Sequence, residues 1–179
     1  MPELPRLERE LRGARVVLRP YAERDIPEIL IAYQDDPELH LRLGERRPPS
    51  GAELGRQFEL AEAERRAGRR LLLTITAPDD DRCLGRLAVH SVDWGRRAAE
   101  LALWVAPAAR RRGRGSEALA LAARWLLSVG GLVCLGLRIA GENEAMVRTA
   151  MRAGAVRRES AEGDELRYEI AAAGAPGDG

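Results

Sequence analysis

Two hydrophobic periods mark the first part of the chain. Residues 15–19 (Arg-Val-Val-Leu-Arg) alternate, which predicts a short strand that Pro20 ends. From Ile26 to Tyr33 the apolar residues recur at helical spacing, which predicts a helix with Asp25 as its N-cap residue. The run Asp35-Asp-Pro37 ends this helix, so a loop is expected to follow it.

A second helix is predicted over residues 51–67. Ser50 and Glu53 have the spacing of a capping box, in which each side chain bonds the other residue's backbone N–H. Leu54, Phe58 and Ala61 share one face, and Gly68 is suited to end the helix. Residues 38–49 are left as the loop between the two helices.

Strands dominate the middle of the chain. The segments 70–77, 83–92 and 97–106 are apolar and joined by short turns, which predicts an antiparallel meander. A helix from Gly115 to about Ser128 then leads to an apolar strand over 132–139. Because a helix connects them, this strand should lie parallel to the preceding one. A helix over 143–153 follows, and the strands 156–159 and 166–170 should form a final hairpin around Glu162-Gly-Asp164.

Length and composition bound the class of protein. The 179 residues suggest one domain over 15–170, preceded by an extension of 14 residues (1–14) that forms a short helix or frays. The Ala/Gly/Pro-rich tail 171–179 is predicted to be disordered. The formal net charge of +1 argues against a dedicated nucleic-acid binder. No signal peptide and no apolar run near 18 residues is present, so we expect a cytoplasmic protein without a membrane partner.

The cysteines and histidines do not form a metal pattern. Cys83 and Cys134 each lie in or beside an apolar strand, which favours buried, inert thiols over reactive ones. His40 and His90 are far apart, and neither has the spacing to a cysteine that a metal site needs. No metal is therefore expected.

The candidate chemistry centres on a basic loop between a strand and a helix. Residues 110–116 are Arg110, Arg111, Arg112, Gly113, Arg114, Gly115 and Ser116. A glycine-bearing loop that leads into a helix N-terminus directs backbone N–H groups and a positive dipole toward one point, which suits a pyrophosphate. The alternatives are an RNA-binding Arg-Gly tract or a solvated basic face. The position between a strand and a helix, rather than in a low-complexity region, favours the phosphate site.

The pattern Arg110-x-x-Gly113-x-Gly115 resembles the signature of GNAT N-acetyltransferases, which use acetyl-CoA. The element order agrees with that resemblance from about residue 15 to residue 170. The resemblance implies the GNAT fold, an α/β (α+β) arrangement with a mixed central sheet, an antiparallel N-terminal meander and helices on both faces. The segment 99–107 resembles the RimJ/RimL-like branch, which acetylates protein N-termini and small amines.

The resemblance also implies roles for backbone groups. In that branch the strand has a bulge beside Pro107, which frees the N–H groups near Trp104 and Val105 to bind the thioester carbonyl and the pantetheine arm. Trp104 can equally be a core aromatic residue. Asn143 matches the family asparagine that bonds the pantetheine arm, and it is also a suitable N-cap residue.

Two positions depart from the family pattern. At the position where the family often has a tyrosine that acts as the acid, this chain has Ala150. At the position after Gly154, where the family usually has an aromatic residue, it has Ala155. The RimJ/RimL-like branch commonly lacks that tyrosine as well. These departures support an alternative hypothesis, a CoA-binding GNAT-like protein with little catalysis that acts as a regulatory or structural subunit.

Glu100 is the candidate catalytic residue. Acetylation needs the amine deprotonated, so a base or a water chain must take its proton. Glu100 lies four residues before Trp104, a spacing that resembles the water-mediated glutamate base of the histone-acetyltransferase branch. A solvated strand glutamate is the alternative. Where another branch has a fifth-strand glutamate base, this chain has Arg138.

The acceptor site is predicted in the loop after the first helix. In the RimJ/RimL-like branch this region forms a wall of the site, so His40 and Arg42, with Glu45 and Arg47, are candidates to face the substrate. They can also be ordinary loop charges. The sequence thus predicts an N-acetyltransferase that transfers acetyl from acetyl-CoA to a primary amine of a peptide N-terminus or a small molecule, with a homodimer left open.

Overall fold

A computed structural model describes residues 2–159 and 165–172. Within them, one sheet runs in the order β1-β2-β3-β4-β5-β6-β8-β7. Its strands are β1 (Leu11–Arg12), β2 (Val17–Pro20), β3 (Leu71–Ala77), β4 (Asp80–Asp93), β5 (Ala98–Val105), β6 (Cys134–Ala140), β7 (Val156–Arg158) and β8 (Glu165–Ala171). The sheet is mixed: β5 and β6 pair in parallel, and the other neighbours pair antiparallel. The predicted meander β3-β4-β5 and the parallel return of β6 are confirmed.

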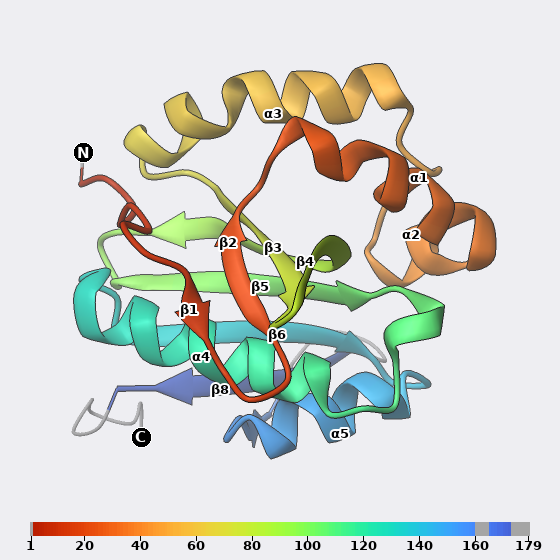
Figure 1. The fold of residues 1–179 in the computed structure, drawn as a ribbon. Helices are drawn as coiled ribbons and strands as arrows, with labels where there is room; N and C mark the ends of the chain where they lie inside the picture. The colour runs from red at the N-terminus through yellow and green to blue at the C-terminus, as the bar shows by residue number, and fades with distance from the viewer. Residues whose placement is uncertain (1, 160–164, 173–179) are drawn as a thin grey trace.

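Helices cover both faces of the sheet, as predicted (Figure 1). They are α1 (Ile26–Asp35), α2 (Leu39–Arg42), α3 (Gly51–Arg66), α4 (Arg114–Val129) and α5 (Glu144–Arg152), with short 3-10 turns at Glu23–Asp25 and Pro107–Ala109. Figure 1 shows α1 and α3 on one side of the sheet and α4 and α5 on the other. This is the α/β architecture expected from the sequence.

Two apolar clusters hold the layers together. The larger one packs α4 against alternate residues of the strands, including Leu103 and Leu137. α4 supplies mostly alanine and leucine, so its backbone can lie close to the sheet. The smaller cluster packs Ile29 of α1 and Leu54 of α3 against Trp104 on the opposite face of β5. Because side chains alternate along β5, one strand contributes to both clusters.

The N-terminal extension differs from its prediction. It is not a helix, and it does not fray over its described residues: Leu4 and Leu7 are buried in the larger cluster. The backbone N–H of Leu4 donates to Arg65 O at 3.1 Å, and the Arg65 guanidinium donates to Leu4 O at 2.5 Å. Two isolated leucines among charged residues gave no periodic signal, although together they bury a useful apolar area.

The predicted cap at Asp25 is also wrong in its detail. Asp25 precedes α1, but its side chain makes no cap hydrogen bond to that helix. Instead, the buried carboxylate accepts from Arg19 at 2.6 and 2.9 Å and from Thr74 Oγ1 at 2.6 Å. The capping box of Ser50 and Glu53 on α3 is confirmed, with both reciprocal bonds present.

Other boundaries shift by a few residues. β4 begins at Asp80, inside the turn expected between the segments 70–77 and 83–92, because Ala77 pairs with Asp80. The loop 38–49 contains the short helix α2. The strands of the final hairpin pair as predicted, but the turn 162–164 lies outside the described residues, as does the tail beyond 172. Ala171, expected in the tail, ends β8.

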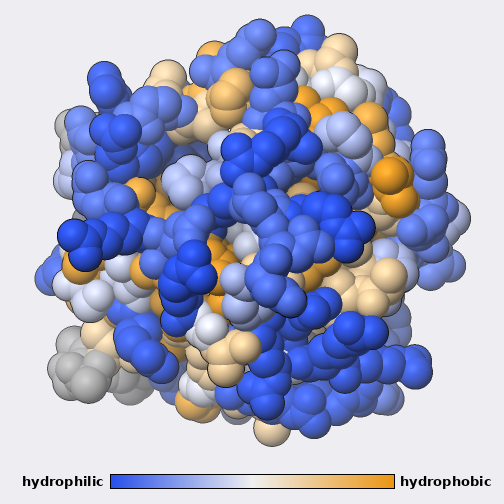
Figure 2. All heavy atoms as spheres, viewed as in Figure 1, coloured by the Kyte–Doolittle hydropathy of each residue, from blue (hydrophilic) through white to orange (hydrophobic). Residues whose placement is uncertain are grey.

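The described residues contain no helix long and apolar enough to cross a membrane. Figure 2 shows hydrophilic side chains over most of one face, with apolar side chains in small separate groups. Both cysteines are free. Cys83 is buried, and burial raises the pKa of its thiol to about 12, as expected for an inert thiol.

Candidate functional site

The basic loop has an unusual backbone conformation. Arg111 has φ of 62° and Gly113 has φ of 70°, so two left-handed residues lie on either side of Arg112. Successive N–H groups in such a segment point to the same side and form a concave anion-binding nest. A left-handed arginine is strained, and such strain concentrates at binding sites.

α4 begins slightly earlier than predicted, at Arg114, with Gly113 as its N-cap residue. The first intrahelical bond that this cap allows runs from Glu117 N to Gly113 O, at 3.1 Å. The N–H groups of Arg114, Gly115 and Ser116 therefore have no intrahelical partner. Together with the nest, they form a site for a phosphate group at the positive end of a 16-residue helix.

The two glycines of the loop differ in conformation and surroundings. Gly113 adopts a positive φ, and nothing lies closer than 3.6 Å to the position of an added Cβ. A Cβ on Gly115 would lie 3.4 Å from Thr149 Cγ2 of α5 and 3.7 Å from Leu103 and Val105 of β5. A Cβ on Gly115 would thus make ordinary contacts with β5 and α5, and this position does not need the left-handed conformation that Gly113 adopts.

The loop's arginines divide into two groups. Arg110 turns inward, where its Nε donates to Val105 O at 2.8 Å and its guanidinium bonds Asp36. Arg112 lies at a hollow of about 360 Å³ at the start of α4, beside Gly113 and Ser116. Arg15 and Arg152 line the same hollow. Sequence reasoning missed both, because they lie far from the loop in sequence and only the fold brings them there.

β5 and β6 separate just before the loop. They pair only from Ala98–Cys134 to Glu100–Gly136, so the rest of β5 has no partner on that side. Ala106 N–H donates to Leu84 O on the β4 side. Because alternate residues direct their N–H groups to opposite neighbours, Leu103 and Val105 direct theirs into the opening.

This arrangement corrects the expected bulge. β4 and β5 pair in regular register from Gly85–Val105 to His90–Glu100, and the irregularity lies at the other end of the ladder, between His90 and Asp93. The N–H of Trp104 points to β4, and its ring belongs to the core beside Tyr33, with ring centroids 6.2 Å apart. Strand separation, rather than a bulge, frees the N–H of Val105.

Asn143 is the N-cap residue of α5, as predicted, and its Oδ1 accepts from Met146 N at 3.1 Å. The two positions that depart from the family pattern are core positions here. Ala150 is fully buried, and Ala155 is 7% exposed; both belong to the larger apolar cluster. The described structure thus uses these sites for packing.

Glu100 lies on the face of β5 that bears Trp104, where the strands separate. Its carboxylate accepts from Arg138 Nε at 2.8 Å, and its side chain is 15% exposed. His90 is directly opposite it on β4. Burial lowers the pKa of His90. The charge of Glu100 offsets part of this lowering, whereas the charges of Arg70 and Arg138 add to it. This imidazole, which sequence reasoning did not select, is therefore neutral near pH 7 and able to accept a proton.

The predicted acceptor residues do not share one surface. Arg42 bonds Asp36, the same carboxylate that Arg110 bonds, so it links α2 to the basic loop. His40 is half-buried, and its Nδ1 has no hydrogen-bond partner among the described residues. Glu45 and Arg47 do lie together, at the edge of a larger pocket.

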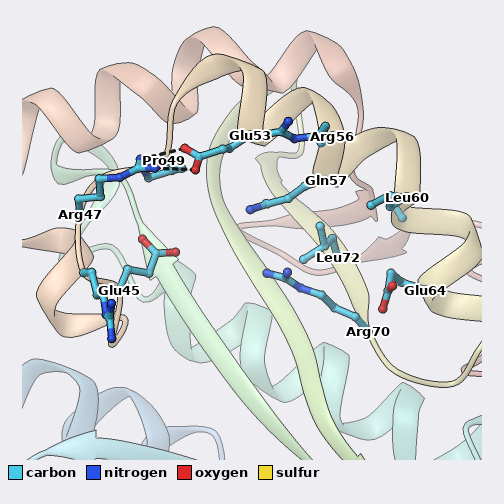
Figure 3. Close-up of a pocket in the computed structure, with 12 residues that line it drawn as sticks. Glu45, Arg47, Pro49, Glu53, Arg56, Gln57, Leu60, Glu64, Arg70 and Leu72 are labelled. Carbon is cyan, nitrogen blue, oxygen red and sulfur yellow. Dashed lines mark hydrogen bonds and ion pairs between the residues drawn. The ribbon is translucent and has the colours of Figure 1, made fainter.

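That pocket, of about 700 Å³, lies between the loop after α2, helix α3 and strand β3 (Figure 3). Its lining includes Gln57 and Leu60 of α3, Arg70 just before β3, Leu72 of β3, and Glu45 of the loop. Tyr33 Oη donates to Glu45 at 2.8 Å and its ring contacts Trp104, so this wall extends to β5. Within the described residues, no group of three or more His, Cys, Asp and Glu side chains is placed to hold a metal.

The family model for the acetyltransferase (GNAT) domain matches residues 15–156. The chain therefore belongs to the GNAT acetyltransferase family. No curated protein is significantly similar to it in sequence.

Solved structures share the fold at low identity. An acetyltransferase from Salmonella typhimurium that modifies the N-terminal serine of ribosomal protein L7/L12 has a TM-score of 0.77 and 15% identity, covering 92% of this chain and 99% of that one. Mycobacterium smegmatis RimJ, solved with a CoA disulfide, has a TM-score of 0.74 and 22% identity over 90% and 84%. Spermidine N-acetyltransferase from Vibrio cholerae, solved with CoA and spermine, has a TM-score of 0.74 and 18% identity. The match covers 89% of this chain and 96% of that one.

Proposed function

We propose that this protein transfers the acetyl group of acetyl-CoA to a primary amine by direct attack on the thioester. One observation carries the proposal: the nest at Arg111–Gly113 and the free N–H groups of α4 lie at the end of the strand whose N–H groups are left open by β6. A phosphate site and an open strand edge together match an elongated ligand with a pyrophosphate and an amide-bearing arm.

The residues present fit acetyl-CoA. The N–H groups of Arg114, Gly115 and Ser116, with Arg112, would hold the pyrophosphate, while Arg15 and Arg152 supply further positive charge. The N–H groups of Leu103 and Val105 would bond the pantetheine arm and the thioester oxygen, with Asn143 near the arm. When bound, acetyl-CoA supplies an activated acetyl group.

The chain's own part in the reaction is to place donors and remove a proton. Preorganised N–H groups stabilise the oxygen that becomes negative when the amine attacks. The amine must lose a proton, and Glu100 would accept it through water. His90, opposite Glu100, would extend the path for that proton.

The alternative is a CoA-binding subunit with little catalysis. The Glu100–Arg138 ion pair favours it, because the guanidinium occupies a carboxylate oxygen that a water on the path from the amine would otherwise contact. Buried Ala150, where the family often has a tyrosine acid, favours it as well.

A thiol-release assay with acetyl-CoA separates the two. We expect release of CoA that depends on an amine, from a panel of N-terminal peptides, amino sugars, amino acids and polyamines, with acetylated product detected by mass spectrometry. Tight CoA binding by calorimetry without turnover of any amine would establish the alternative instead.

A further inference from the structure

Two arginines beside the large pocket are shielded from solvent and yet form no ion pair with an acid among the described residues. Among the described residues, three arginines are buried: Arg19, Arg65 and Arg86. Arg19 and Arg65 are each paired with carboxylates. Arg86 is not; its guanidinium donates to Gln57 Oε1 at 3.0 Å and lies 5.7 Å from the centre of the Tyr21 ring. A buried charge without a counter-ion is costly.

Arg70 also has no ion pair with an acid among the described residues, and it lines the pocket directly. Its side chain is half-buried, and its Nε is buried without a hydrogen-bond partner among the described residues. Figure 3 shows Arg70, just before β3, and Gln57 of α3 extending into the pocket, with Glu45 on the loop opposite. Burial lowers the pKa of Arg70, and the nearby charge of Arg86 lowers it further. The two guanidiniums repel each other there.

The acids around the pocket form no ion pair with Arg70 among the described residues, and the charges of Glu45 and Glu64 offset only part of the lowering of its pKa. Glu53 is paired with Arg47, and Glu64 with Arg69. Glu45 accepts from Tyr33, and no ion pair within 4.0 Å joins it to Arg70. An anionic group placed at Arg70 would relieve the repulsion and satisfy the unused donors at once. A guanidinium's fork of donors matches a carboxylate or a phosphate.

A row of paired strand residues leads from the edge of the pocket to β5, the strand at which the amine would react. On the same face of the sheet, Leu72 pairs with Ala88, and Ala88 pairs with Ala102. Neighbouring strands are about 4.8 Å apart, so Ala102 lies roughly 10 Å from Leu72. Ala88 and Ala102 are the small members of this row; both pack in the smaller apolar cluster, with Ala88 buried and Ala102 partly exposed.

We infer that the acceptor of the acetyl group is a small amine that also carries a carboxylate or a phosphate, and that this anionic group binds Arg70 beside Arg86. The inference rests on the proposed acetyl transfer and adds the substrate class. The amine end would extend along the Ala88–Ala102 row and the Tyr33–Glu45 wall toward β5. A polyamine, which is cationic throughout, would fit this pocket poorly.

Matched acceptor pairs test the inference. One pair is glucosamine 6-phosphate and glucosamine; the other is the dipeptides Ser-Asp amide and Ser-Asn amide. We expect kcat/KM for at least one anionic member to exceed that of its neutral partner by at least tenfold. Preference in the first pair alone identifies a phosphate, and in the second alone a carboxylate. Spermidine should be poorer than either.

Arg70→Gln assigns the preference to this residue. The ratio of anionic to neutral kcat/KM should fall at least tenfold, mainly through the acceptor KM, while CoA affinity and the circular dichroism spectrum stay as in the wild type. Arg66→Gln is the control, because Arg66 lies on α3, is exposed and pairs only with Glu62. It should leave the ratio unchanged.

The outcomes separate this inference from the proposed function. Equal turnover of both members in both pairs, or a ratio that Arg70→Gln does not change, overturns the inference and leaves acetyl transfer intact. If no amine is turned over, calorimetry with glucosamine 6-phosphate and Ser-Asp amide on the CoA-loaded protein decides. Weaker binding to Arg70→Gln supports an anion site at Arg70, and absence of binding to the wild type overturns it.

Discussion

At the scale of single residues, Gly113 does what no other residue type can do cheaply. Its φ of 70° lies in the left-handed region, and with this conformation it is the N-cap residue of α4. A side chain in this left-handed region costs roughly 1–2 kcal/mol, and a β-branched one more. The anion site therefore depends on a conformation that only glycine adopts freely.

Gly113→Val should weaken acetyl-CoA binding at least tenfold, about 1.4 kcal/mol. The backbone N–H groups would turn away, and two methyl groups would crowd the phosphate. Gly131→Val is the matched control, because Gly131 also has a positive φ, of 69°, and no atom lies within 4 Å of an added Cβ. Calorimetry should show a loss of affinity only at Gly113; equal affinities for the two variants would remove the phosphate site from the loop.

Glu100 carries the second prediction at this scale. Glu100→Gln keeps the size but removes the proton acceptor, so kcat should fall roughly 10- to 100-fold, at or just below the range of about 10²–10⁴ that general-base loss gives. The KM for acetyl-CoA should hardly change. The loss should shrink at high pH, where the amine is already deprotonated in solution.

Glu165→Gln is its control, since Glu165 also lies near Arg138, at 3.9 Å. It should retain the wild-type pH–rate profile. Full activity of Glu100→Gln at pH 7 would return Glu100 to an ordinary strand residue that only pairs with Arg138.

At the scale of elements, α3 shows how local chemistry starts a helix and shapes a pocket. Ser50 and Glu53 cap each other, and Arg47 donates two hydrogen bonds to Glu53 at 2.7 and 2.9 Å. Hydrogen bonds from Arg47 and Ser50 lower the pKa of Glu53 from 4.5 to about 2. The same contacts fix the loop that closes one side of the pocket.

A depressed carboxyl pKa stabilises the fold above the unfolded value and loses that effect as pH falls through the folded value. Glu53 should therefore stabilise the protein above pH 4.5, with the effect fading between pH 4.5 and about 2. Glu53→Gln should lower the melting temperature at pH 7, and the difference should vanish near pH 2. Glu59→Gln, on the exposed surface of the same helix, should show no such pH-dependent difference in thermal unfolding.

Local patterns predicted most elements, and the misses have a common cause. The capping box of α3, the Asn143 cap and the parallel β6 follow from short-range spacing or connectivity, and they are confirmed. The burial of Leu4, the partners of Asp25 and the gathering of Arg15 and Arg152 at the basic loop arise from contacts between distant segments. The sequence could not show either that Arg86 is buried without an ion pair among the described residues. It shows how many charged residues exist, but not which of them lie beside a residue of opposite charge.

At the scale of the whole molecule, charge is balanced while its distribution is not. The formal net charge is +1, and most arginines of the described residues pair with nearby acids. Arg112 and Arg114 at the start of α4, and Arg70 and Arg86 at the large pocket, are among the described arginines for which no ion pair within 4.0 Å is present. This distribution suits small anionic ligands at two places rather than a continuous nucleic-acid backbone.

We therefore expect no specific RNA binding at physiological salt. Arg110, the first arginine of the tract, is held by Asp36 and Val105 O, which removes it from a nucleic-acid surface. Filter binding or fluorescence anisotropy with structured and single-stranded RNA, at several salt concentrations, would measure this. A submicromolar complex that CoA displaces would instead make the basic loop an RNA site.

The separation of β5 from β6 also bears on aggregation. Unpaired strand edges ordinarily invite another chain to add a strand, and proteins protect their outer edges against it. Here the open N–H groups of Leu103 and Val105 lie inside the sheet, between strands that meet again at Glu100 and Gly136. A wedge closed at one end admits a thin, flexible arm more readily than a full strand with side chains on both faces. The unpaired strand edge of β5 can thus stay open for a ligand without promoting the addition of a strand from another protein molecule.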